Sequence, residues 1–150
     1  MKSCKVVIFK INNEEYAADI MQVERILEYI EPTRIPDSPN YVKGIIDYQN
    51  SVLPVIDMKK RFSLEDTGFS EESKIIVVKS NGSYIGISVD MVLEVMDITE
   101  DKIEDTPHIA MKESNKYIKS IFNQNNRIII FLDTDAIIQT KELKVLAKRP

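Results

Sequence analysis

The stretch YVKGIIDYQNSVLPVIDMKKRF, residues 41–62, holds most of the local signals that decide the fold, and it occurs twice. Residues 38–62 align without a gap with residues 114–138, so that Tyr117 lies 76 positions after Tyr41. Average residue usage would give about one or two identical pairs by chance. The identical pairs are Ser38/Ser114, Tyr41/Tyr117, Lys43/Lys119, Ile45/Ile121, Asn50/Asn126 and Asp57/Asp133. The sequence therefore predicts an internal duplication.

Each copy of this repeat predicts a β-hairpin followed by a helical turn. In the first copy, Gly44 leads into apolar residues, residues 48–51 supply turn chemistry, and a second apolar run of strand length follows. Asp57 and its counterpart Asp133 come next, where a carboxylate can accept the free N–H groups of a helical turn. Pro54 cannot donate to a sheet, so we expect its strand at an edge or at a bulge.

The remainder of the chain predicts a second repeated pattern. Four short apolar runs indicate two further hairpins, residues 6–11 with 16–18 and residues 75–78 with 84–89. Apolar residues at helical spacing follow Asp19 and Asp90, so we expect a short helix after each, the first within residues 19–26. The acidic segment at residues 63–73 is predicted to be a solvated loop between the two halves.

These elements predict one mainly β domain over residues 1–150, because a chain of this length buries about two-thirds of its unfolded surface. Its approximate halves are residues 5–64 and 73–138, with an N-terminal strand that the halves can share. Residues 139–150 are predicted to form a C-terminal helix, with basic residues near its end that complement the helix dipole.

Composition limits the compartment and the partners. Cys4 is the single cysteine, so an internal disulfide is excluded, and no apolar run approaches the ~20 residues of a membrane span. Residues 1–10 lack the long apolar region of a signal peptide, so we expect a cytoplasmic protein without direct membrane insertion. With 24 acidic and 20 basic residues, the net charge of −4 argues against nucleic acid as the main partner. Protein partners fit this composition better.

No set of residues predicts catalysis, a metal site or a cofactor. His108 is the only histidine, and in a charged connector it is expected to be a surface residue. Cys4 has no activating neighbour in the sequence. Asp133 and Asp135 could hold a hard cation, but the capping role of Asp133 is the favoured interpretation. We therefore expect a protein that is not an enzyme.

A series of motifs resembles the CheW adaptor family of bacterial chemotaxis over residues 5–138. The motifs are D-I-x-x-V-x-x-I at residues 19–26, P-V-I-D and K-x-F within residues 54–62, and G-I-x-V-D at residues 86–90. The resemblance implies two five-stranded SH3-like β-barrels that lie side by side, with short helices. It also implies a non-enzymatic adaptor that binds the regulatory domain of the histidine kinase CheA and the cytoplasmic tips of chemoreceptors, and that is recruited to membrane-associated arrays.

The resemblance assigns receptor contacts to a groove between the barrels. Ile20 and Val95 would form its apolar walls, and Gly86 belongs to the same set. Arg25 and Gln49 stand where the family commonly has a glutamate and an arginine that form a pair. A receptor fitted to the usual pair would therefore meet a different charge pattern here.

Kinase contacts are assigned by the same resemblance to Val23, Gly44, Glu104 and Ile109. Gly44 precedes a strand, where another backbone can approach closely. Glu104 stands where an arginine is common in the family, and Ile109 where a phenylalanine is common. These departures keep open a divergent CheW paralogue that scaffolds a different sensory array.

A third interpretation is a small β-barrel that binds nucleic acid. Such a module of SH3 or OB type would need a basic face interleaved with aromatic residues. The aromatic content of 7% and the negative net charge speak against it. An adaptor remains the favoured class.

Overall fold

The computed structural model describes residues 3–104 and 116–139, which form two β-sheets and four short helices, so the mainly β fold class is confirmed. The first sheet has six strands, in the order β8 (Met91–Thr99), β1 (Ser3–Ile11), β2 (Glu14–Asp19), β11 (Arg127–Leu132), β10 (Ile118–Gln124) and β9 (Ile103–Glu104). The second has five, in the order β3 (Val23–Glu28), β6 (Lys74–Ser80), β7 (Ser83–Val89), β5 (Ser51–Asp57) and β4 (Val42–Tyr48).

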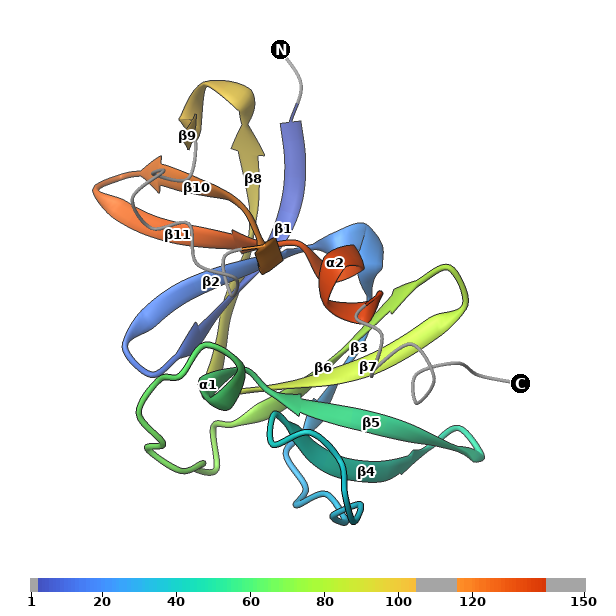
Figure 1. The fold of residues 1–150 in the computed structure, drawn as a ribbon. Coiled ribbons are helices and arrows are strands. Elements are labelled where there is room, and N and C mark those ends of the chain that lie inside the picture. Colours follow the sequence, from blue (N-terminus) through green and yellow to red (C-terminus); the bar gives the residue numbers. More distant parts are fainter. Residues whose placement is uncertain (1–2, 105–115, 140–150) are drawn as a thin grey trace.

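Figure 1 shows the first sheet above the second, with two α-helical turns, α1 (Met58–Arg61) and α2 (Thr134–Ile138), near the boundary between them. The 3-10 turns are η1 (Ile20–Gln22), which follows β2, and η2 (Glu100–Lys102), which follows β8. No helix within the described ranges is long and apolar enough to cross a membrane. Residues 140–150 of the predicted C-terminal helix, together with Ile109 and His108, lie outside the residues that the structure describes.

The two copies of the repeated hairpin have the same register, which confirms the predicted duplication. Ile46 pairs with Leu53 in β4–β5, and Phe122 pairs with Ile129, 76 positions later, in β10–β11. Each hairpin has a bulge at the same place, between Val42 and Gly44 in one copy and between Ile118 and Ser120 in the other. Both turn residues have positive φ in both copies, at Gln49 and Asn50 and at Asn125 and Asn126.

Pro54 sits at a local gap in the sheet rather than in an edge strand. β5 lies between β7 and β4, but its parallel pairing with β7 begins only at Val55. The backbone N–H and C=O of Ile45, which lies opposite Pro54, bond to Thr33 at 2.8 and 2.9 Å, away from β5. Neither neighbouring strand therefore needs a backbone N–H group from Pro54 for its hydrogen bonds.

One continuous stretch of chain, from β3 to β7, forms the second sheet, whereas the first sheet combines β1 and β2 with β8 to β11. β3 follows β2 in sequence but pairs with β6 in the second sheet, and β8 follows β7 but pairs with β1 in the first. The sheets therefore divide the chain differently from the predicted halves at residues 5–64 and 73–138. The helices predicted after Asp19 and Asp90 are wrong, because long-range pairing overrides the helical spacing and only η1 remains helical.

Among the residues that the structure describes, three apolar clusters form the core, one inside each sheet and one shared between them. The first sheet encloses Ile8, Phe122 and Phe131, and the second encloses Leu53 and Val77 with their neighbours. The shared cluster joins both sheets to both α-helices and includes Phe9, Val42, Ile76, Tyr117, Leu132 and Ile138. Strands such as β1 and β6 are thus buried on both faces, which explains why their sequences are continuous apolar runs rather than alternating ones.

Candidate protein-binding site

The structure places Ile20 in η1 and Val95 on β8, on either side of β1. Val95 of β8 pairs with Val7 of β1, and Val7 pairs with Ala18, two residues before Ile20. Val95 is 53% exposed although it continues the buried row of Val7 and Ala18 to the edge of the sheet. One strand therefore separates the two residues that were predicted as apolar walls.

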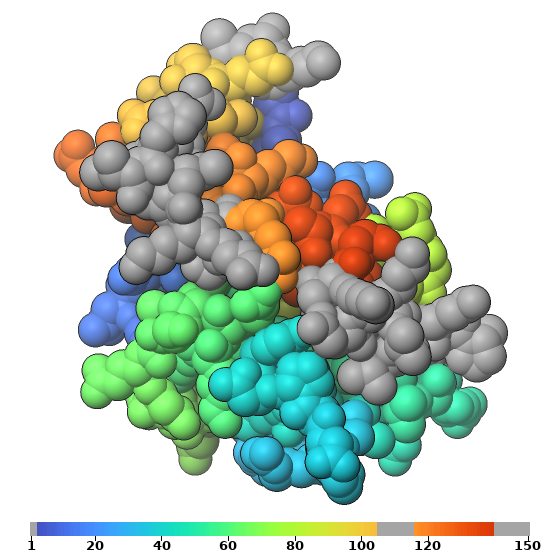
Figure 2. Space-filling model, in the orientation of Figure 1, coloured from blue at the N-terminus to red at the C-terminus, as the bar shows by residue number. Residues whose placement is uncertain are grey.

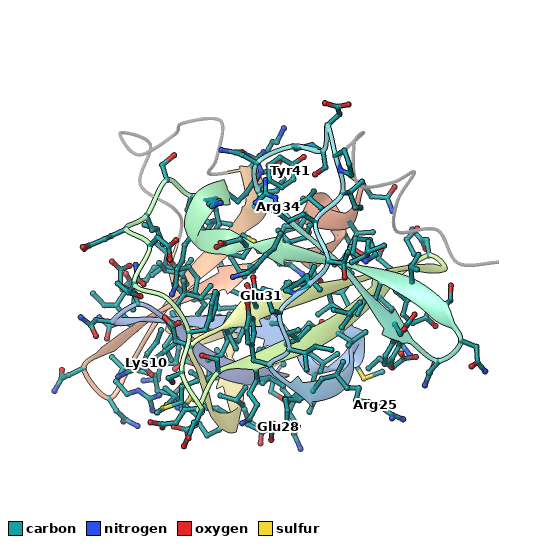
Figure 3. All side chains as sticks on the ribbon, turned by 90° about the horizontal axis from the view of Figure 1, so that it is seen from below. Lys10, Arg25, Glu28, Glu31, Arg34 and Tyr41 are labelled. Carbon is teal, nitrogen blue, oxygen red and sulfur yellow. The ribbon has the colours of Figure 1, made fainter. Side chains whose placement is uncertain are left out.

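Arg25 lies on the edge strand β3 and not on the predicted helix, with its side chain exposed. Figure 3 shows it pointing outward at the rim of the second sheet, apart from Arg34 and Tyr41. Its neighbour Glu24 accepts a 2.6 Å hydrogen bond from the hydroxyl of Tyr48, the residue before Gln49. This bond joins the two edge strands of the sheet, β3 and β4, so Arg25 and Gln49 each adjoin one end of it.

Gly86 and Gly44 are buried and shape the backbone rather than offer a contact surface. A Cβ at Gly86 would lie 2.7 Å from Ile75 Cγ2, inside the core of the second sheet. A Cβ at Gly44 would lie 2.3 Å from the carbonyl oxygen of Thr33, whose backbone crosses directly over the bulge. The close backbone approach expected at Gly44 is thus present, and any influence of either glycine on binding would be indirect.

The predicted kinase residues do not gather in one place among the described residues. Val23 is half-buried and packs against the shared core. Gly44 lies under Thr33 at the far edge of the same sheet. Glu104 is exposed on β9, the edge of the other sheet.

Exposed apolar side chains are the clearest surface feature that the predicted site did not include. Met21, directly after Ile20, is 80% exposed, and Ile26, directly after Arg25, is 41% exposed. Both extend the predicted receptor surface with apolar area. The strand-like spacing of residues 23–28, obscured by the helical interpretation, was the signal that could have shown Ile26 on an outer face.

A second pair of exposed apolar residues follows from the duplication. Val52 is 49% exposed and its counterpart Ile128 is 66% exposed, each just after a hairpin turn. Beside Ile128, Arg127 bonds to Glu15 and to Glu94, the latter at 3.0 Å. These carboxylates, led by Glu15, raise the pKa of the Arg127 guanidinium, so its charge is held in place beside an exposed apolar residue.

A buried lysine, missed in the sequence, fixes the segment at residues 63–73. Lys59 Nζ lies 2.8 Å from Asp90 Oδ1 and 2.9 Å from Thr67 Oγ1, and its side chain is 2% exposed. It also lies 4.5 Å from the ring centre of Phe69, which stacks on Tyr29. Through Thr67, the carbonyl of Gly68 and Phe69, Lys59 therefore anchors the predicted solvated loop to the protein.

Arg61 lies between the two tyrosines that the repeat makes equivalent. Its guanidinium carbon is 4.9 Å from the ring centre of Tyr41 and 4.3 Å from that of Tyr117, and it donates a hydrogen bond to the Tyr117 hydroxyl. Figure 2 shows the segments that contain these residues meeting on one face of the molecule. Arg61 thus links the two copies of the repeat.

The aspartates considered for a cation have structural partners. Asp133 caps α2 by accepting the backbone N–H of Ala136 at 3.0 Å, as predicted. Asp135 accepts hydrogen bonds from Gln22, at 2.7 Å, and from Ser80. Within the described part of the chain, no three His, Cys, Asp or Glu side chains are placed to hold a metal ion.

The described residues therefore define a small two-sheet β protein whose main surface features are exposed apolar side chains and fixed charges. The chain belongs to the CheW family, because the model of the CheW-like domain matches residues 5–142. It is 32% identical to a chemotaxis protein CheW of Bacillus subtilis over 89% of this chain and 86% of that protein. It is also 30% identical to a chemotaxis protein CheW of Thermotoga maritima, over 96% of this chain and 93% of that protein.

A solved structure has the same fold. It is the scaffolding protein TtCheW from Thermoanaerobacter tengcongensis, which matches with a TM-score of 0.84 and 31% identity. The match covers 94% of this chain and 96% of that chain. The resemblance inferred from the motifs is confirmed, and a role as a chemotaxis scaffold or adaptor follows from it.

Proposed function

We propose that this protein is a non-enzymatic adaptor that couples the cytoplasmic tips of chemoreceptors to the regulatory domain of the histidine kinase CheA. The observation that carries the proposal is the CheW-like domain over residues 5–142, with chemotaxis relatives that align over most of their length. An adaptor needs two surfaces that can be occupied together. The protein would work in the cytoplasm, held at membrane-associated receptor arrays by its partners.

The proposed receptor surface combines Ile20, Met21 and Val95 with Arg25 on β3. Exposed apolar area supplies the hydrophobic contribution, and residues of this kind are typical of interface cores. Arg25 has no carboxylate within 4.0 Å among the described residues, so it is available for an acidic group of the receptor. Gln49 would lie beside this contact through the Glu24–Tyr48 hydrogen bond.

The residues proposed for kinase binding are spread over both sheets, and the exposed one, Glu104, lies in a different sheet from Arg25, which would let both partners bind at once. Val23 and Gly44 support the second sheet, while Glu104 is exposed on β9 and Ile109 follows in sequence. Substitutions at Val23 or Gly44 would act through the shape of the backbone. Glu104 is the described residue of this set that can form an ion pair directly.

The experiment that tests the proposal is reconstitution of a ternary complex. The full chain is mixed with receptor fragments and the kinase encoded by the same genome, and complexes are resolved by size-exclusion chromatography with light scattering. The proposal predicts a complex that contains all three proteins, and kinase activity that depends on receptor only when the adaptor is present. Binding of neither partner would refute it.

Arg25 gives a sharper test of the receptor surface. Arg25→Glu should weaken receptor binding more than Arg25→Ala, because a reversed charge at an interface repels where a truncated one is only lost. Lys79→Glu, on another exposed strand position, is the matched control for net charge. Equal affinities of all three variants at low and high salt would exclude Arg25 from the contact.

The departures at Arg25 and Gln49 favour a second candidate, a CheW paralogue that serves a different sensory array. The double variant Arg25→Glu with Gln49→Arg restores the pair that the family commonly has. It should shift binding toward receptors fitted to that pair and away from the cognate receptor. Unchanged preference would remove the support for a separate array.

A further inference from the structure

The two edge strands of the first sheet line a single pocket. β8 and β9 are the outermost strands, yet Ile98 of β8 and Ile103 of β9 both face a cavity of about 230 Å³, together with Phe131 of β11. The sheet therefore curls until its edges approach one another, with η2 connecting them (Figure 1). Cys4 on β1 and Lys119 on β10 also line the pocket.

The floor of this pocket is apolar. Ile98 is 1% exposed and Phe131 is 4% exposed, whereas Ile103 is 39% exposed at the rim. Burial raises the pKa of the Cys4 thiol, with Asp19 acting in the same direction and Lys119 opposing it. A cavity of this size has room for roughly eight water molecules, which find few hydrogen-bond partners on apolar walls. An apolar group that displaced such water would bind favourably.

A cation stands at the mouth of the pocket. Lys119 Nζ lies 5.3 Å from the ring centre of Phe131, and no carboxylate oxygen of the described residues is within 4.0 Å of it. Glu100, on η2, lines the same pocket without pairing with Lys119. The site thus offers one positive charge for an anion, and one negative charge that disfavours a second anionic group.

We propose that this pocket binds a small monocarboxylate with an apolar body. The apolar part would lie against Ile98, Ile103 and Phe131, and the carboxylate would pair with Lys119. Glu100 would select against dicarboxylates. This inference goes beyond the adaptor function and does not depend on it, because none of the pocket residues belongs to the proposed receptor or kinase contacts.

The lone thiol reports directly on the pocket. Cys4 is the only cysteine of the chain, so the rate of its alkylation by iodoacetamide in the full-length protein measures access to the wall. Octanoate should slow alkylation by at least about threefold, because a bound ligand beside the thiol blocks the reagent. Octanedioate should protect less, and acetate at the same concentration should not protect. Octanoate is used at concentrations that leave the amide NMR spectrum unchanged outside the pocket.

Variants separate this site from adventitious binding. Lys119→Gln should abolish protection, while Lys102→Gln, on η2 but outside the pocket lining, should retain it. Protection is compared as the ratio of rates with and without octanoate in the same variant, since Lys119 itself affects the pKa of Cys4. Absence of protection, or equal protection in Lys119→Gln, would overturn the proposal. Protection by receptor or kinase fragments but not by octanoate would assign the pocket to a protein contact instead and would equally overturn it.

Discussion

The two copies of the hairpin unit end in α1 and α2, and these helices perform one task with opposite charges. Lys59 in α1 and Asp135 in α2 are equivalent positions of the repeat. Lys59 binds Asp90, where the chain crosses from the second sheet to the first, and Asp135 binds Gln22 in η1, where the chain crosses from the first sheet to the second. Each helix therefore anchors one of the two crossovers at which the chain passes from one sheet to the other.

The two anchoring side chains, Lys59 and Asp135, differ in how deeply they are buried. Lys59 is 1% exposed and reaches its partners inside the protein, whereas Asp135 is exposed and bonds to the neutral side chains of Gln22 and Ser80. A buried ion pair depends on both partners, while exposed hydrogen bonds can be replaced by water. The two copies thus have the contact at the same position, but its contribution to the free energy of unfolding differs between them.

Removal of the buried cation should have the largest effect on stability. Lys59→Met should lower the free energy of unfolding by about 3 kcal/mol, toward the low end for a broken buried pair because Asp90 keeps some exposure. Asp135→Ala should cost only about 1 kcal/mol. Urea denaturation measures both, with the exposed neighbour Lys60→Met as control. Equal losses for Lys59→Met and Asp135→Ala would contradict the comparison.

The equivalent bulges should respond differently to an added methyl group. Gly44→Ala should destabilise by about 2 kcal/mol, because its Cβ would overlap the carbonyl oxygen of Thr33. Ser120 at the equivalent bulge already carries a side chain, so Ser120→Ala should change stability by under about 1 kcal/mol. Thermal unfolding of the two variants compares them. A tolerated Gly44→Ala would show that Thr33 can move away.

The two helix caps provide a smaller contrast. Asp57 is buried and accepts the N–H groups of Lys59 and Lys60 at 2.9 and 3.4 Å, whereas Asp133 is half-buried and accepts one, from Ala136. Asp57→Ala should therefore cost about 1.5 kcal/mol and Asp133→Ala about 0.5 kcal/mol. Chemical denaturation at pH 7 tests the order. A larger loss at Asp133 would place the stronger anchor at α2.

The smallest expected effect on stability occurs only at alkaline pH and concerns a tyrosine that packs beside α1. Tyr16 stacks on Phe62, the C-cap residue of α1, and burial raises the pKa of the Tyr16 hydroxyl to about 12. Because this pKa is above the unfolded value of about 10, the neutral hydroxyl's contribution is intact below pH 10 and is lost as pH rises through 12. Tyr16→Phe should flatten the loss of stability over this range. An unchanged slope would mean that Tyr16 ionises without unfolding cost.

Local chemistry explains which predictions from sequence succeeded. The hairpins, their turns and the caps at Asp57 and Asp133 each depend on a few consecutive residues, and the structure has them in register at both copies. The helix predicted over residues 19–26 failed because four apolar positions in eight residues fit a helical face and an edge strand alike. Residues 23–28 form a strand rather than a helix because they pair with β6, which is some fifty residues away in sequence.

The prediction of the binding site was incomplete for the same reason, because it also depends on contacts between segments that are distant in sequence. The family resemblance located Ile20, Arg25 and Val95, which lie on surfaces where a partner can reach them. It could not show that Gly86 is enclosed by Ile75, Leu53 and Val55, since burial depends on strands from both halves.

By itself, the sequence determined the duplication, the β-hairpin units with their capped turns, and the family. Tertiary structure alone decided that the chain passes to the second sheet at β3 and returns to the first at β8, that Lys59 is buried against Asp90, and that the edges of the first sheet curl around a pocket. Turn and cap energies are set by neighbouring residues and are legible in a short window. Strand partners and burial are set by contacts between distant segments, whose competing arrangements differ in free energy only once the whole core has been assembled.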